Sequence, residues 1–502
     1  MDFLTYGLAT VLDPTNLLFC LIGCVIGTLI GVLPGLGPTA TISMLLPVTY
    51  GLGPLPSIVM LAGIYYGSMY GGSTSAILLN MPGEPASVMT CIDGNRMTRN
   101  GRAGVAIFTA GMSSFIAGIM ATFLIAIFSP PLSELAFKFG PAEFCLLMVL
   151  GFVTVGVVTT GDMLKGIGMA IIGILLGTVG TDINSGVMRY TFGIADLADG
   201  IGFAIVAVGL FAFADIAKNL ADKMDFSVYR GKINLIPAWS DVRRLIPSSL
   251  RGGAIGSFFG LIPGGSAAMS SFAAYAVEKK FSSHRDEIGQ GAVEGVAGPE
   301  SANNAASQTG FIPLLSLGIP ENATMALMLG ALIINGIQPG PMVIVKQPEL
   351  FWGIVASMLI GNLILVILNI PLIKIWVQML KVPYHVLYPV IIAVCCVGVY
   401  SIGNNPNDVI IAAAFGLAGY YLLTLGLEAA PLMLGLILGP MFEEYFRRQM
   451  MIANGSLMPF IERPISLALT VALAGVVIYG LYRMFRKGPI SKSLDFTEKP
   501  NP

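Results

Sequence analysis

The sequence predicts an all-α polytopic membrane protein, with about 11 or 12 transmembrane helices in two inverted-topology repeats. The 502 residues are 55% hydrophobic and only 11% charged, and their mean hydropathy is +0.81. Soluble domains carry about 25% charged residues. The apolar runs are long enough to span a bilayer, which takes about 20 residues. Similar Pro-Gly interruptions also occur once in each half of the chain.

Apolar segments follow one another along the whole chain. The first set lies at about 16–47, 55–80, 103–129, 143–160, 165–181 and 200–217. A polar stretch at 218–247, rich in Lys and Arg, is predicted to be a cytoplasmic linker. The second set lies at about 250–277, 305–336, 350–372, 385–402, 408–425, 429–442 and 465–482. We therefore divide the chain into a first repeat (1–217), the linker, a second repeat (248–445), and a C-terminal helix with a cytoplasmic tail (446–502).

Four short matches, in the same order, indicate that the two halves are repeats. They pair Gly31–Gly35 with Gly260–Gly264, Leu79–Pro82 with Leu317–Pro320, Val155–Val158 with Val397–Tyr400, and Asp162 with Asp408. Each match is weak alone, because apolar and Gly-rich sequence matches itself easily. Their common order favours a duplication.

Each repeat is expected to contain a re-entrant helical hairpin, near 16–47 and near 250–277. In the second copy, the segments 250–263 and 264–277 are both too short for a full crossing. Two half-length arms around a Pro-Gly tip would enter and leave the membrane on one side. The first copy fits either two such arms or a single kinked helix, and the sequence leaves both open.

Basic residues predict the orientation, because cytoplasmic loops carry an excess of Lys and Arg. Both flanks of the second hairpin are basic, whereas the flanks of the first contain neither Lys nor Arg. Matching loops thus carry opposite charge bias, so the repeats are expected to be inverted, with a periplasmic N-terminus and a cytoplasmic C-terminus. Arg447 and Arg448, which this scheme places outside, are its weakest point, although Glu443 and Glu444 lie nearby.

The sequence shows no catalytic constellation. It has no phosphate-binding loop and no nucleophile elbow, and its only histidines are His284 and His385. We therefore expect neither an enzyme nor a cofactor, with Na⁺ as the one candidate metal ion, and the net charge of −1 gives no reason to expect a nucleic-acid partner. Irregular backbone at membrane depth is tolerated only where protein buries it or a watery cavity borders it. Paired interruptions in two repeats are the best sequence pointer to the binding site of a transporter.

The two Pro-Gly tips and two polar stretches supply the candidate site residues. Glycines let an anion approach free backbone N–H groups at a helix start, and hydroxyls add donors. The expected substrate-binding residues are Pro34, Gly35, Gly37, Thr39, Thr41, Ser73, Thr74, Ser75, Gly264, Gly265, Ser266, Asn303 and Asn304. The ion-coupling candidates are Asn80, Glu84, Glu300, Ser307 and Glu321. Three alternatives stay open. The small residues can merely let helices pack closely, the segment 288–308 can be a partly solvated loop, and the three glutamates can be interface charges instead of coupling groups.

At these residues the sequence resembles the large membrane subunit of tripartite tricarboxylate transporters, the TctA family. The resemblance covers nearly the full chain. It runs through "GTLIGVLPGLGPTATISMLLP", "YYGSMYGGSTSAILLNMPGEPASVMTCIDG", "GLIPGGSAAMSSFAAYAVEKK" and "GPESANNAASQTGFIPLLSLGIPEN". The glycine-rich motifs of the family fall on Pro34–Gly37 and Pro263–Ser266.

The resemblance implies a secondary transporter of the bacterial inner membrane, with an elevator-like architecture by analogy of fold. It also implies two protein partners, a small four-helix membrane subunit and a periplasmic substrate-binding protein. The implied substrates are di- and tricarboxylates such as citrate, or some aromatic carboxylates, driven by a Na⁺ or H⁺ gradient. The alternative is a stand-alone carboxylate channel or exporter without a binding-protein partner, and a membrane-embedded enzyme is a third, weaker hypothesis.

Overall fold

The protein is almost entirely helical in the computed structural model, which describes residues 2–33, 37–158, 163–182, 185–222, 233–262, 265–340, 342–379 and 384–486. The elements up to residue 222 are α1 (Asp2–Val11), α2 (Pro14–Val32), α3 (Pro38–Thr49), α4 (Pro54–Leu79), η1 (Pro85–Ser87), α5 (Val88–Arg99), α6 (Ala103–Ala136), α7 (Pro141–Val158), α8 (Met163–Gly177), β1 (Gly180–Thr181), β2 (Met188–Arg189), η2 (Ala195–Leu197), α9 (Phe203–Ala207), the π-helix η3 (Val208–Phe213) and α10 (Ala214–Asp222).

The part of the chain after the polar stretch is likewise helical. Its elements are α11 (Trp239–Leu261), α12 (Ala267–Phe281), η4 (Arg285–Glu287), α13 (Glu294–Thr309), α14 (Phe311–Leu317), α15 (Ala323–Ile334), α16 (Met342–Lys346), α17 (Pro348–Asn369), α18 (Ile373–Met379), α19 (Tyr384–Gly403), α20 (Pro406–Thr424), α21 (Ala429–Ile452), α22 (Pro459–Glu462) and α23 (Pro464–Arg486).

Six of the described helical stretches are long and apolar enough to cross a membrane. They are Pro14–Val32, Ala103–Leu135, Phe203–Ala221, Pro348–Asn369, Pro406–Thr424 and Pro464–Tyr482. Four shorter apolar stretches lie at Pro141–Thr154, Leu164–Gly177, Ala323–Ile334 and Tyr388–Gly403. The predicted all-α polytopic membrane protein is therefore confirmed, while the count of 11 or 12 crossings stays a prediction.

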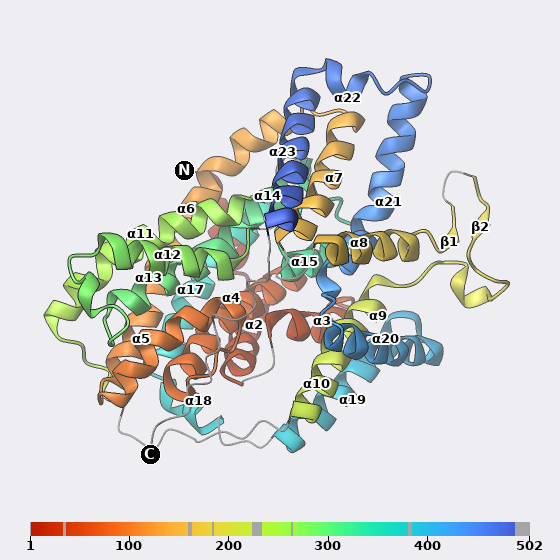
Figure 1. The fold of residues 1–502 in the computed structure, drawn as a ribbon. Coiled ribbons are helices and arrows are strands. Elements are labelled where there is room, and N and C mark those ends of the chain that lie inside the picture. Colours follow the sequence, from red (N-terminus) through yellow and green to blue (C-terminus); the bar gives the residue numbers. More distant parts are fainter. Residues whose placement is uncertain are drawn as a thin grey trace.

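The helices gather in three neighbourhoods (Figure 1). α2 and α4 lie at the centre, beside the group formed by α11, α12 and α13. α7, α8, α21 and α23 form a second group at the upper right, and α9, α10, α19 and α20 a third at the lower right. The β1–β2 hairpin projects beyond α8. One large cluster of buried apolar residues runs through these groups.

Glycines make the contact between α2 and α4 unusually close. A Cβ atom on Gly23, Gly27 or Gly31 of α2 would lie 2.2, 2.4 or 2.4 Å from a backbone carbonyl oxygen of α4. From the other side, a Cβ on Gly67 or Gly71 would lie 2.7 or 2.4 Å from a carbonyl oxygen of α2. Small residues at a spacing of four let two membrane helices approach backbone to backbone.

The same construction recurs between α11 and α13. A Cβ atom on Gly252, Gly256 or Gly260 would lie 2.2, 2.2 or 2.5 Å from a backbone carbonyl oxygen of α13. These glycines are the positions that the predicted alignment of the two halves places on Gly23, Gly27 and Gly31. This correspondence is what a duplication would leave, although the inverted repeat itself stays a prediction.

Both predicted hairpins have longer first arms than expected. α2 has 19 residues and is long enough to cross, whereas α3 has 12. α11 has 23 residues and begins at Trp239, inside the stretch predicted as linker, and α12 has 15. The second arms are short and the first arms longer than the sequence indicated, and the re-entrant hairpins stay a prediction. The polar first turns of α11 hid its start, because Arg243 and Arg244 lower the hydropathy there.

Ion pairs surround Arg447, one of the two arginines that the predicted orientation places on the external side of the membrane. Arg447 on α21 pairs with Glu443 (2.6 Å) and with Asp182 (3.0 Å), which directly follows β1. Arg189 of β2 also pairs with Glu443, at 2.8 Å. The Arg447 charge is thus neutralised locally instead of standing alone.

A buried carboxylate joins the two halves at another end of the molecule. Asp93 of α5 accepts hydrogen bonds from the backbone N–H groups of Gly289 (2.9 Å), Gly291 (2.7 Å) and Ala292 (2.9 Å), and from the Tyr275 hydroxyl (2.9 Å). Gly289 and Gly291 have φ values of 95° and 101°, which side chains other than hydrogen rarely allow. The loop therefore wraps around a carboxylate 0% exposed to solvent.

Replacing Asp93 by asparagine is expected to lower the free energy of unfolding by about 1.5–3 kcal/mol. The substitution removes the charge that strengthens these hydrogen bonds and turns one acceptor into a donor facing N–H groups. Denaturation in detergent micelles measures the loss, and hydrogen exchange at 289–292 should rise with it. Asp286→Asn, at an exposed position, is the control. Equal stability of both variants would contradict the prediction.

Candidate functional site

The second arms of the two predicted hairpins, α3 and α12, begin directly after the Pro-Gly tips. Pro34, Gly35 and Gly264 lie outside the described residues, whereas Gly37, Thr39, Thr41, Gly265 and Ser266 are described. Gly37 and Ser266 are the residues that precede α3 and α12. The Ser266 side chain caps α12 by accepting a hydrogen bond from the Met269 N–H group. Thr41 donates to the Gly37 carbonyl.

Two breaks between helices lie near these starts. At each break, one residue adopts the left-handed backbone conformation. Asn80, with φ 59°, directly follows α4, and Gly318, with φ 74°, directly follows α14. Asparagine and glycine are the residues that adopt this conformation most readily. Prolines then follow both breaks. The predicted pairing of Leu79–Pro82 with Leu317–Pro320 therefore joins segments of similar local geometry.

Each arm start contacts the break of the other half. Thr39, at the start of α3, hydrogen-bonds to Thr324, at the start of α15 just after the second break (2.8 Å). Ala267, the first residue of α12, packs with Ala86, just after the first break, and with Ala306 of α13. The structure thus brings the starts of both second arms into contact with the two breaks.

α13 supplies most of the polar groups in this region. All 16 of its residues are buried, so the alternative of a partly solvated loop is wrong for 294–309. Glu300 accepts hydrogen bonds from Ser73 of α4 (2.5 Å) and from Thr90 of α5. Asn304, one turn further along α13, donates to the Ser114 hydroxyl of α6 at 2.7 Å.

A second carboxylate joins the same helix. Glu84, in the first break, accepts a hydrogen bond from the Asn303 amide nitrogen at 2.8 Å. The amide oxygen of Asn303 is buried and has no hydrogen-bond partner among the described residues. Ser307 lies one turn beyond and donates to the Asn303 carbonyl. Unpaired polar atoms of this kind are rare in protein interiors, and each calls for an explanation.

The third carboxylate lies in the second break. Glu321 accepts a hydrogen bond from the Asn322 side chain (2.9 Å), which also donates to the Tyr65 hydroxyl (3.1 Å). The other carboxylate oxygen of Glu321 is buried, and no group in the described part of the chain donates to it. A Cβ on Gly310, after α13, would lie 2.6 Å from the Glu321 carboxyl carbon. Glu321 therefore lies against the end of the helix that carries Glu300 and Asn303.

No basic side chain compensates these three carboxyls in the part of the chain that the structure describes. Glu84, Glu300 and Glu321 are 6%, 0% and 1% exposed, and every ion pair found among the described residues involves other acids. Burying an ionised carboxylate without a cation is very costly. Nor do the acids, cysteines and histidines described here gather into a group of three that would hold a metal ion. Each carboxyl thus calls for a proton or a monovalent cation.

The remaining candidates occupy less central positions. Ser75 donates to the Gly72 carbonyl within α4, and Thr74 borders a small cavity beside α6. Sequence reasoning missed Tyr65, Thr90, Ser114, Asn322 and Thr324, which complete the hydrogen bonds of the predicted residues. Among these, Asn322 and Thr324 follow the second Pro-containing break directly, so the break itself was a usable signal.

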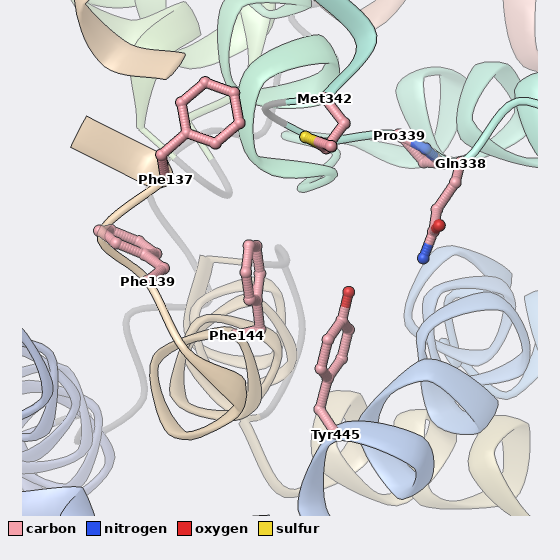
Figure 2. A pocket seen from close by; sticks show the side chains of 8 residues that line it. Phe137, Phe139, Phe144, Gln338, Pro339, Met342 and Tyr445 are labelled. Atoms are coloured by element: carbon pink, nitrogen blue, oxygen red, sulfur yellow. The ribbon is translucent and has the colours of Figure 1, made fainter. Parts of the chain in front are cut away.

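A separate pocket of about 220 Å³, whose lining contains none of these carboxyls, lies between the end of α6, α7, α21 and the loop before α16. Figure 2 shows Phe137, Phe139 and Phe144 on one side, Gln338 on the other, and the Tyr445 hydroxyl pointing into the space between them. Phe144 and Tyr445 stack with ring centroids 5.1 Å apart. None of the residues predicted as site residues lines this pocket.

Comparisons with known proteins agree with the resemblance. The sequence pattern of the "Tripartite tricarboxylate transporter TctA family" matches residues 17–434. The chain is 52% identical over 477 residues to an uncharacterized 52.8 kDa protein in the TAR-I ttuC′ 3′ region of Agrobacterium vitis, covering 95% of each chain. It is 56% identical over 214 residues to an uncharacterized protein in the TAR-II ttuC′ 3′ region of the same organism, covering 43% of this chain and 88% of the relative. No solved structure matches significantly.

Proposed function

Because the chain belongs to the tripartite tricarboxylate transporter TctA family, we propose that it carries di- or tricarboxylates, or related organic acids, across the bacterial inner membrane. A Na⁺ or H⁺ gradient drives the import. A periplasmic binding protein delivers the solute, and a small four-helix membrane subunit completes the complex. The substrate class and partners follow the family, and the residues described above supply the mechanism.

The observation that carries the proposal is the set of three buried carboxyls without basic partners among the described residues. Glu84 and Glu321 lie in the two helix breaks, and Glu300 lies on α13 between them. Intramembrane acids of this kind mark proton or ion pathways. Taking up a proton or cation removes the cost of the buried charge, which couples ion binding to the arrangement of the two breaks.

The starts of α3 and α12 provide for the substrate. Free N–H groups and the positive dipole end of a helix attract carboxylates, and Thr39 adds a hydroxyl where α3 meets α15. An anionic substrate beside carboxyls is tolerated once those carboxyls have taken up protons or cations. This charge balance gives a reason for obligatory coupling between organic acid and ion.

The orientation in the membrane is proposed from the distribution of Lys and Arg, and the movement from the predicted pair of repeats. We propose an external N-terminus, a cytoplasmic C-terminus, and an inverted pair of repeats whose central region moves as in an elevator. The closely packed pairs α2–α4 and α11–α13 would then move as rigid units, because their backbones touch along several turns.

Reconstitution tests the coupling directly. The chain and its small membrane subunit are placed in liposomes, and the binding protein is added with labelled di-, tri- or aromatic carboxylates. We expect accumulation above the external concentration when an inward Na⁺ or H⁺ gradient is imposed, and none after an ionophore dissipates it. Uptake that merely equilibrates the solute would favour the channel alternative. An unchanged rate without the binding protein would contradict the proposed delivery.

A further inference from the structure

A small cavity of about 10 Å³ lies between α4, α6 and α17. Its polar lining consists of Tyr70, Ser73, Thr74, Ser114 and Asn369, and its remaining walls are aliphatic side chains and a glycine. A space of this size holds about one water-sized sphere. Buried cavities with polar walls are seldom empty, since their polar atoms need partners.

The hydroxyl protons of two lining residues are already committed elsewhere. Tyr70 donates to the Asn362 side-chain oxygen at 3.3 Å. Ser73 donates to Glu300 at 2.5 Å, and the Met69 carbonyl lies 3.0 Å from the same hydroxyl. The oxygen atoms of Tyr70 and Ser73 therefore offer lone pairs to the cavity, but no proton.

Asn369, the last residue of α17, offers a third oxygen with free lone pairs. Its amide nitrogen donates to the Leu365 carbonyl (3.0 Å) and to the Thr28 hydroxyl (3.3 Å). Its side-chain oxygen is buried and has no partner among the described residues, and the residue is 3% exposed. A single water molecule has two protons to give and cannot donate to all three oxygens at once, whereas a cation can contact all three.

We propose that this cavity binds one Na⁺ ion through the oxygens of Tyr70, Ser73 and Asn369, with the hydroxyls of Thr74 and Ser114 completing the shell. Hard cations prefer oxygen ligands, and the divalent ones are held by carboxylates, of which none lines the cavity. The negative charge is supplied one residue away, by Glu300 through Ser73. The space of a single water-sized sphere admits a bare Na⁺ ion, and of the two coupling ions that the proposed function allows, H⁺ and Na⁺, only Na⁺ takes a shell of oxygen ligands. The inference rests on the proposed function and names its coupling ion.

Thermal unfolding of the intact complex in lipid nanodiscs tests the site without transport. We expect the melting temperature of the wild type to rise with NaCl, and not with KCl or choline chloride at equal ionic strength, because an ion that binds only the folded state stabilises it. Asn369→Leu keeps the side-chain size but removes the oxygen, so the half-saturating Na⁺ concentration should rise at least about tenfold. Thr74→Val should raise it in the same direction.

Controls separate the site from general effects on folding. Asn16→Leu changes another buried asparagine, in the first turn of α2, which does not line the cavity. This variant should keep the Na⁺ response of the wild type even if its melting temperature falls. An equal effect of Na⁺ and choline on the wild type would overturn the site. So would unchanged half-saturation in both Asn369→Leu and Thr74→Val. Uptake that is driven by an H⁺ gradient alone would overturn the Na⁺ site but leave the proposed importer intact. Passive uptake together with an unchanged response of the melting temperature to Na⁺ would contradict the importer but leave the site intact.

Discussion

Replacing Glu300 by glutamine is expected to reduce gradient-driven accumulation of the organic acid to background while leaving the complex folded. Glutamine has the size of glutamate and retains hydrogen-bonding atoms for Ser73 and Thr90, which both contact Glu300. It carries no charge and exchanges no proton in the physiological range. The substitution therefore removes coupling without opening a hole in α13. Uptake into liposomes under imposed Na⁺ and H⁺ gradients measures the effect.

Exchange of labelled solute across the membrane distinguishes loss of coupling from loss of the site. A neutral glutamine resembles the protonated glutamate, so exchange with solute present on both sides should continue after net uptake has stopped. Glu300→Asp keeps the charge but shortens the reach, and should recover part of the uptake. Glu349→Gln changes an exposed acid and should behave as the wild type. Full accumulation by Glu300→Gln would remove Glu300 from the coupling mechanism.

The buried acids could be predicted because their chemical surroundings are visible in the sequence. Glu84, Glu300 and Glu321 each stand beside proline, asparagine or serine within otherwise apolar runs. Such residues are rarely tolerated at membrane depth without a function. The sequence singled them out as candidates but left a partly solvated loop open for Glu300, and the structure places all three below 10% exposure.

The partners of these acids could not be predicted in the same way. Thr90 and Ser114 contact Glu300 and Asn304 from helices about 200 residues away in sequence. Which hydroxyl meets which carboxyl depends on how helices rotate against one another, and short-range periodicity does not contain that information. Asn369 illustrates the same limit, since nothing around it distinguishes it from an ordinary helix-ending residue.

The start of α11 shows where hydropathy misleads. Arg244 lies in its second turn, yet it pairs with Glu287 and Glu294, each at 2.7 Å. Arg251 pairs with Glu278 at 2.7 Å. The acids that neutralise these arginines come from α13, α12 and the loop between them. A window of sequence sees only the arginines, so it assigns a linker where a helix has begun.

Replacing Gly27 by leucine is expected to have the largest effect on stability of any substitution considered. Even a Cβ at this position would lie 2.4 Å from the carbonyl oxygen of Ile64, well inside contact distance. That oxygen belongs to the backbone of α4 and cannot turn away. The two helices must separate along a contact that continues through Gly23 and Gly31, so the free energy of unfolding should fall by at least about 3 kcal/mol. Denaturation in detergent micelles measures this loss.

Matched glycines show whether the close approach, and not the residue type, is responsible. Gly475 lies in α23, and a Cβ atom on it would have no neighbouring atom within 4 Å. Gly475→Ala should therefore be neutral or slightly stabilising, because alanine favours a helix. Gly27→Ala should already destabilise the protein, and Gly256→Ala should do the same between α11 and α13, where the corresponding distance is 2.2 Å. If Gly27→Ala and Gly475→Ala had equal stability, the backbone contact between α2 and α4 would not hold these helices together.

Because α2 leads directly to the first hairpin tip, a separation of the two helices would also displace that tip, and uptake should fail at temperatures where the variant is still folded.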